Sequence, residues 1–385
     1  MGKKQVPLIT GQLQILFHRG LSGVWSKSQP WGRRILRRVE GRETPYSAKI
    51  GSSELQLARE AVEAVVGSLA RKPSTREPKD RSLVPPSSAG KCAYQTLYEK
   101  LPYPIEPKDL RQKVNFLAGD IWERIFRYYL RRCNFGGFKF IETGDLVRKI
   151  RLGKSGSVNG YYDGIIEAPW EAVAEAVGGD REAFEQLVPI VNGKKKPHIR
   201  VLFEMKTRTE AGYRRSIDNS FGYRSQLGLY IRAAMESGEI DVPYGVFLLL
   251  NKNTNHCREE WYWEENLKRE IEMADENYDN LEQLFAGKDL EKWLSTAEGR
   301  KSLFHEAGEI LGKRPSKAGF DCFSTKVNEF IEVDALKGHT ILLEGKMLGF
   351  QCGYCDHKYS CHSSRPPDRF EYNDDRAIPR HEPVW

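Results

Sequence analysis

Three residues in this chain have the types and spacing of a metal-assisted hydrolytic site: Asp163, Glu204 and Lys206. Residues two apart on a strand share a face, so Glu204 and Lys206 point to the same side of the apolar segment 199–206. An acid and a lysine on a buried strand are costly unless a ligand or partner compensates their charges. With Asp163 on a neighbouring strand, two carboxylates and the Met205 carbonyl would form an oxygen site suited to Mg²⁺ or Mn²⁺. The competing interpretation is a salt bridge on an edge strand.

The chemistry that this set predicts is attack of water on a phosphate. The ion would lower the pKa of the attacking water and stabilise charge on the phosphate, while Lys206 would orient or polarise the water. Gln226 and Tyr230 stand at i and i+4 of a predicted helix, so they share one face of it. They would position the nucleic-acid strand or the lysine; the alternative is an ordinary surface pair on that helix.

The sharpest local motif is the C-x2-C-x5-C of Cys352, Cys355 and Cys361. Clustered cysteines in a long chain favour metal binding in a reducing compartment over a disulfide framework. Four thiolates can hold a [4Fe–4S] cluster or a tetrahedral zinc ion. A purely local zinc site would take His357 or His362 as its fourth ligand.

The elements that must position these residues follow from the hydrophobic pattern. Apolar residues recur with a helical period in 115–132, 223–236 and 264–285, and strand-like runs occupy 138–150, 160–166, 199–206 and 244–250. An insertion at 169–197 is predicted to hold one or two helices and a lysine-rich loop. The resulting order of helix, three strands, helix and strand predicts an α/β fold.

In this order, Asp163, Glu204-x-Lys206 and Gln226-x-x-x-Tyr230 resemble the motifs of the RecB-like branch of the PD-(D/E)XK nucleases. The chain is most similar to the subset with an iron–sulfur staple, such as the CRISPR-associated RecB-like exonucleases, the AddB nuclease domain and phage exonucleases. The resemblance implies a restriction-endonuclease-like core, in which helices flank a central mixed sheet, with helical elaborations and a C-terminal cysteine cluster.

The resemblance also implies two further ligands. Cys92, which follows Ser87-Ser88, matches the family's first cluster cysteine, so an iron–sulfur cluster would join both ends of the nuclease core; zinc is the alternative. The family usually carries G-x-x-x-His on its first core helix, with the histidine binding metal. Here Gly119 is followed by Glu123 at that position. We expect Glu123 to be a further metal ligand; the alternative is a solvated helix residue.

The domain organisation expected from the sequence has three parts: a basic N-terminal arm with a helical and linker region at 1–84, the nuclease domain at 85–362 and a polar tail at 363–385. The formal net charge is +7, and residues 1–39 contain no acid. Such an arm, which also holds Trp25 and Trp31, suits phosphate attraction and base stacking. A merely solvated arm and an organelle transit peptide are the alternatives.

The expected function is that of a Mg²⁺- or Mn²⁺-dependent exonuclease that degrades single-stranded DNA or duplex ends in DNA repair, recombination, or phage or CRISPR DNA processing. No helicase motif is visible, so a helicase or a recombination or CRISPR partner would be a separate chain. No segment has the ~20 apolar residues of a membrane span, which predicts a soluble protein of the cytoplasm, or of the host cytoplasm if viral. The alternatives are a structure-specific or spacer-processing endonuclease and a non-catalytic DNA-binding protein.

Overall fold

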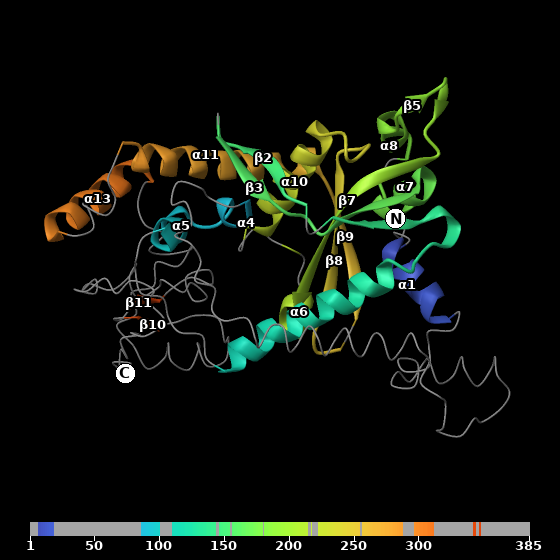
Figure 1. Ribbon diagram of the computed structural model, residues 1–385, viewed down its shortest axis with the longest axis horizontal. Coiled ribbons are helices and arrows are strands. Elements are labelled where there is room, and N and C mark those ends of the chain that lie inside the picture. Colours follow the sequence, from blue (N-terminus) through green and yellow to red (C-terminus); the bar gives the residue numbers. More distant parts are fainter. Residues whose placement is uncertain are drawn as a thin grey trace.

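A mixed five-stranded sheet lies at the centre of the molecule, as the computed structural model shows (Figure 1). The structure describes residues 7–18, 86–100, 110–143, 146–154, 156–179, 181–214, 217, 222–254, 256–287, 296–311, 342–343 and 346–347. The strands run in the order β1 (Lys139–Glu142), β4 (Gly164–Pro169), β7 (His198–Arg208), β8 (Tyr244–Asn251) and β9 (Cys257–Trp263). Only β7 and β8 are parallel to each other, and the other neighbours are antiparallel. The predicted α/β class is confirmed.

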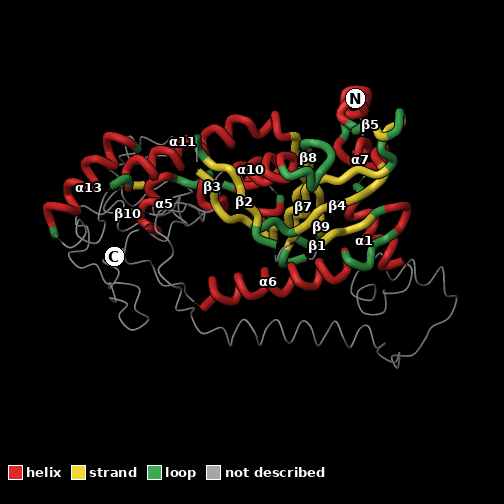
Figure 2. The backbone as a smooth tube through the Cα atoms, turned by 45° about the horizontal axis from the view of Figure 1, so that its top comes forward, coloured by secondary structure: helices red, strands yellow, loops and turns green. Residues whose placement is uncertain are grey.

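Helices cover both faces of this sheet (Figures 1 and 2). On one face lies α10 (Tyr223–Glu236), with α11 (Lys268–Phe285) packed against it, and on the other lie α6 (Leu110–Leu130) and α7 (Trp170–Val177). Every residue of β8 is buried, and its side chains alternate between the two apolar clusters: Phe247 packs with α10, whereas Leu248 belongs to the cluster of α6. A strand that is buried on both faces has a continuous apolar sequence, so β8 could be predicted from the sequence.

Smaller elements complete the described part of the chain. They are α1 (Ile9–His18), α4 (Pro86–Ala89), α5 (Ala93–Lys100), η1 (Phe135–Gly137), β2 (Arg148–Leu152), β3 (Gly156–Gly160), α8 (Arg181–Leu187), β5 (Ile190–Val191), β6 (Lys194–Lys195), α9 (Glu210–Tyr213), η2 (Glu264–Leu267), α13 (Ala297–Ile310), β10 (Leu342–Leu343) and β11 (Lys346–Met347). Among the described helices, none has the length and apolar character that crossing a bilayer requires.

The expected strand at 138–150 is wrong. β1 ends at Glu142, and only the last three residues of the range, 148–150, belong to β2, which pairs with β3 in a separate two-stranded hairpin. The strand expected at 160–166 begins instead at Gly164, because Gly160 is the last residue of β3. In the insertion, the two helices are α7 and α8, but two of the three lysines that we expected in a loop, Lys194 and Lys195, form β6 of a short hairpin.

Close contact between α10 and α11 depends on a glycine in the middle of α10. A Cβ atom on Gly228 would lie 2.6 Å from Cγ1 of Ile271 and 3.3 Å from Cβ of Leu267. Overpacking of this kind typically costs about 1–3 kcal/mol. Gly228 stands between Gln226 and Tyr230, so this close contact with α11 lies in the stretch of α10 that carries both residues.

Part of the expected N-terminal arm is packed on the sheet. Helix α1 begins against β9, where the Glu259 carboxylate accepts hydrogen bonds from the amides of Leu8 (3.1 Å) and Thr10 (2.6 Å) and from Nε1 of Trp261 (3.0 Å). A negative charge at a helix N-terminus is favourable, and Ile9 is fully buried beside it. Burial raises the pKa of Glu259 above its ordinary value. The rest of the region 1–84, the tail 363–385 and Trp25 and Trp31 lie outside the described residues.

Candidate active site

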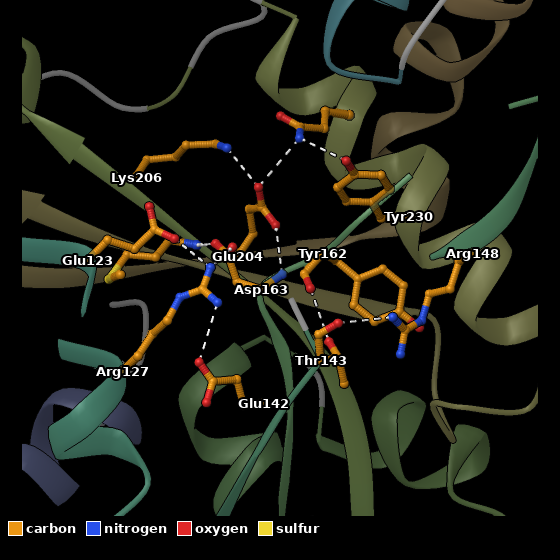
Figure 3. Close-up of polar contacts among 12 residues, drawn as sticks. Glu123, Arg127, Glu142, Thr143, Arg148, Tyr162, Asp163, Glu204, Lys206 and Tyr230 are labelled. Carbon is orange, nitrogen blue, oxygen red and sulfur yellow. Dashed lines mark hydrogen bonds and ion pairs between the residues drawn. The ribbon is translucent and has the colours of Figure 1, made fainter. Parts of the chain in front are cut away.

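The two predicted carboxylates and the lysine lie together on adjacent strands (Figure 3). Gly164 of β4 pairs with Phe203 of β7, which places Asp163, just before β4, beside Glu204. The Asp163 amide donates to Oε2 of Glu204 over 3.4 Å, and Nζ of Lys206 donates to Oε1 of Glu204 over 2.7 Å. Because β7 has β4 on one side and β8 on the other, the alternative of a salt bridge on an edge strand is wrong.

Asp163 is held against the peptide that follows Glu204. Its Oδ2 accepts a hydrogen bond of 2.7 Å from the amide of Met205. The main chain of Met205 therefore belongs to the site, while the role of its carbonyl as a metal ligand stays a prediction. The two carboxylates are anchored to each other's strands, so their spacing is set by the sheet register.

The site concentrates charge away from water. The side chain of Glu204 is 4% exposed, that of Asp163 16% and that of Lys206 18%. Burial, followed by the nearby charge of Asp163, raises the pKa of Glu204 to about 7. Burial would lower the pKa of Lys206, but the charges of Glu204 and Asp163 raise it above its ordinary value, so the lysine stays protonated. These carboxylates repel each other, and added positive charge relieves that repulsion.

Helix α10 contributes the predicted glutamine and tyrosine. Nε2 of Gln226 lies 3.4 Å from Oε1 of Glu204 and 3.1 Å from the hydroxyl of Tyr230. Both side chains are buried, so the alternative of a surface pair is wrong. Burial, with the Glu204 charge second, raises the pKa of Tyr230 to about 12, which keeps it a neutral phenol. In this arrangement Gln226 holds the glutamate and Tyr230 holds Gln226.

Helix α6 brings Glu123 to the same site because a glycine lets it approach β7. A Cβ on Gly119 would lie 2.8 Å from Oγ1 of Thr207. One turn later, the Glu123 carboxylate pairs with Nη2 of Arg127, and the same nitrogen donates to Oδ1 of Asp163 over 2.5 Å (Figure 3). Burial, followed by the charge of Asp163, raises the pKa of Glu123. Glu123 is therefore paired within the site, although its side chain is still 37% exposed.

Arg127 is the residue of this site that we did not expect from the sequence. Besides Glu123 and Asp163, it pairs through Nη1 with Oε1 of Glu142 at 3.5 Å. The signal that could have identified it is its spacing: Arg127 follows Glu123 by four residues, so the two side chains lie on one face of α6.

The donor set fits a hard divalent cation. Asp163 and Glu204 offer carboxylate oxygens at the centre of the sheet, Glu123 points at the same place, and oxygen-only sets of this kind suit Mg²⁺ or Mn²⁺. As the side chains stand, the described residues include no group of three His, Cys, Asp or Glu arranged around one ion. The carboxylates instead form ion pairs with the cations Arg127 and Lys206.

The predicted cluster site is described only at one of its ends. Cys92 lies at the start of α5, half-buried, packed against the apolar cluster that includes α10. Burial raises the pKa of its thiol. Cys352, Cys355 and Cys361, and with them His357 and His362, lie outside the described residues. The cluster and its fourth ligand therefore stay predictions.

Comparisons with known proteins add little to this geometry. No protein-family model matches the chain. A search of curated proteins finds no match either. Among solved structures, the crystal structure of SSO0001 is similar, with a TM-score of 0.30 and 14% identity over 57% of this chain and 85% of that chain. A likeness of this size carries no argument about fold or function.

Proposed function

We propose that this chain is a metal-dependent DNA exonuclease with a PD-(D/E)XK core of the RecB-like branch. The observation that carries the proposal is the buried set of Asp163, Glu204 and Lys206 on two neighbouring strands inside the sheet. A charged group of this composition is costly in a sheet core, and binding a cation and a phosphate would offset that cost. The parallel unit of β7, α10 and β8 supports it further, because it brings Gln226 onto Glu204.

In the proposed reaction the residues of the chain have separate tasks. Asp163, Glu204 and the Met205 carbonyl, together with Glu123, would hold Mg²⁺ or Mn²⁺. When bound, this ion supplies an attacking water of lowered pKa and neutralises charge on the phosphate. Lys206 stays protonated beside Glu204 and orients the water or the phosphate through its ammonium group.

Residues of α10 keep this arrangement rigid. Gln226 fixes the position of the Glu204 carboxylate, and Tyr230 fixes Gln226, so neither Glu204 oxygen turns away from the site. Gln226 and Tyr230 act on the reaction by positioning Glu204.

DNA is the proposed substrate, as single strands or duplex ends. The excess of basic over acidic residues, 60 against 53, favours a polyanion, and electrostatic attraction of this kind supplies much of nucleic-acid affinity. Unwinding of duplex DNA would require a separate helicase or a recombination or CRISPR partner.

A linear and a circular form of the same oligonucleotide test whether the protein cleaves DNA from its ends or in its interior. We expect the intact chain, with Mg²⁺ or Mn²⁺, to degrade a linear single-stranded oligonucleotide and to leave the same sequence intact when it is circularised. EDTA and Asp163→Asn should each stop the degradation. Opening of the circle would show an endonuclease, and binding without any cleavage would show a non-catalytic DNA-binding protein.

We also propose that Cys92, Cys352, Cys355 and Cys361 hold a [4Fe–4S] cluster that joins the two ends of the core. The expected protein is brown, and Cys92→Ser should abolish its broad visible absorbance. Cys133→Ser is the matched control, because Cys133 is buried in the other apolar cluster, beside α6, and should leave the colour unchanged. A colourless protein that contains stoichiometric zinc would contradict the iron–sulfur assignment.

A further inference from the structure

The carboxylates of the site converge on a guanidinium group. Oε1 of Glu123 and Oδ1 of Asp163 both accept from a single nitrogen, Nη2 of Arg127. Figure 3 shows this nitrogen between the two acids, on the side of Asp163 that faces α6. Two anionic oxygens that share one cationic nitrogen mark a position that a small cation could also take.

Arg127 is incompletely satisfied in this position. Its side chain is 17% exposed, and its Nε is buried without a hydrogen-bond partner among the described residues. Arg224 and Arg232 also have a buried Nε without a partner among the described residues, so what sets Arg127 apart is that one of its nitrogens serves two carboxylates of the site. The guanidinium is held by the acids at its Nη end alone, and a long flexible side chain can leave them.

We propose that Arg127 is a resident counter-cation of the carboxylate site, that a divalent metal ion displaces it from Asp163 and Glu123, and that the released guanidinium then binds the phosphate of the substrate. The inference rests on the proposed metal-dependent function. Arg127 thus exchanges one anionic partner for another as the site is loaded.

Electrostatics favour this exchange. A divalent cation that binds the same oxygens while Arg127 is still in contact would lie beside a like charge, and the two would repel each other. Glu142 offers the side chain a second attachment, because it already lies 3.5 Å from Nη1 and is 31% exposed. A guanidinium is also the side chain best shaped to bind phosphate oxygens.

A purely structural arginine predicts the opposite result for metal binding. If Arg127 only holds Asp163 and Glu123 in place, its removal loosens both ligands and weakens the affinity for metal. If it competes with the metal, its removal strengthens that affinity. The sign of the change therefore separates the two roles.

The test measures Mn²⁺ binding to the intact chain by electron paramagnetic resonance of the free ion, without DNA. We expect Arg127→Gln to bind Mn²⁺ about tenfold more tightly than wild type, since part of a like-charge repulsion is removed. Arg127→Lys keeps the charge and should stay near wild type. The matched control is Arg131→Gln, just after the end of α6, where Arg131 is 52% exposed and pairs with Glu142 at 3.3 Å; the affinity of this variant for Mn²⁺ should not change.

A second measurement follows the substrate side of the exchange. At saturating Mn²⁺, Arg127→Gln should require a higher concentration of DNA for half-maximal rate, whereas Arg131→Gln should not. A variant that binds Mn²⁺ more tightly but needs more DNA to reach its half-maximal rate cannot be explained by a loosened site.

The outcomes separate this inference from the function on which it rests. Suppose that Arg127→Gln binds Mn²⁺ no more tightly than wild type, while Glu204→Gln binds it more weakly than wild type. That result would overturn the exchange and leave the proposed metal site standing. Absence of Mn²⁺ binding by both wild type and Arg127→Gln would overturn the proposed metal-dependent function, and the exchange with it.

Discussion

Replacement of Lys206 by methionine, or of Asp163 by asparagine, is expected to slow DNA cleavage by roughly 10²–10⁴-fold, the usual contribution of a positioned catalytic group. Lys206 supplies the ammonium group beside Glu204, and Asp163 supplies one of the two central carboxylates. Single-turnover cleavage of a linear single-stranded oligonucleotide at saturating Mn²⁺ measures the loss. Both changes remove a buried partner, so circular dichroism and thermal melting must show that each variant is folded.

Lys139→Met is the matched control for the lysine. Lys139 lies on β1 of the same sheet, is exposed and pairs across the strands with Glu167, away from the site. Its loss should leave the cleavage rate near that of wild type. Folded Lys206→Met and Asp163→Asn variants that cleave as fast as the wild type would refute the proposed active site.

Affinity for Mn²⁺ is expected to depend on pH through Glu204. The pKa of this carboxyl is raised to about 7, by burial first and by Asp163 second. Below that pH the group holds a proton that metal binding must release, so the affinity should fall about tenfold for each further unit of pH. Above it, Glu204 is ionised and the affinity should level off. A carboxyl with its ordinary pKa would place this break near pH ~4.3.

Titrations with Mn²⁺ from about pH 5.5 to about pH 8 measure this dependence. Glu204→Gln is the control, because an amide carries no titratable proton; its affinity should be low and nearly flat across the range. An affinity of the wild-type chain that is constant between these limits would show that Glu204 is already ionised in the folded protein, or that it does not bind the ion.

Strong periodic patterns predicted the centre of the fold well. The helix expected at 223–236 is α10, with the same bounds, and the strand expected at 199–206 is β7, extended by one residue at its start and two at its end. The juxtaposition of Asp163 with Glu204 was expected because the segments 160–166 and 199–206 were placed on neighbouring strands, and β4 and β7 do pair. In these cases local pattern and tertiary environment agree.

Sequence reasoning missed elements and contacts that depend on tertiary packing. β9 was not expected, because Cys257–Trp263 has two consecutive glutamates and no alternation; its edge position in the sheet lets Glu259 face α1 and Glu260 face the opposite side. The break between β1 and β2 does have a signal in the sequence that we did not use: Gly144 and Asp145, both of types common in turns, stand between the two strands. Arg127 stands at the right spacing from Glu123, yet its contact with Asp163 depends on how α6 lies across β7.

The docking of α1 on β9 has a consequence for synthesis of the chain. Thr10 and its partner Glu259 are 249 residues apart, so α1 leaves the ribosome long before the strand that anchors it exists. At ~5–20 residues per second, that interval is roughly 12–50 s. Throughout this time the apolar side of α1, with Ile9 and Leu13, lacks its native strand and must be shielded by the growing chain or by a chaperone. The first described helix to be translated can therefore complete its native contacts only after β9 has been made.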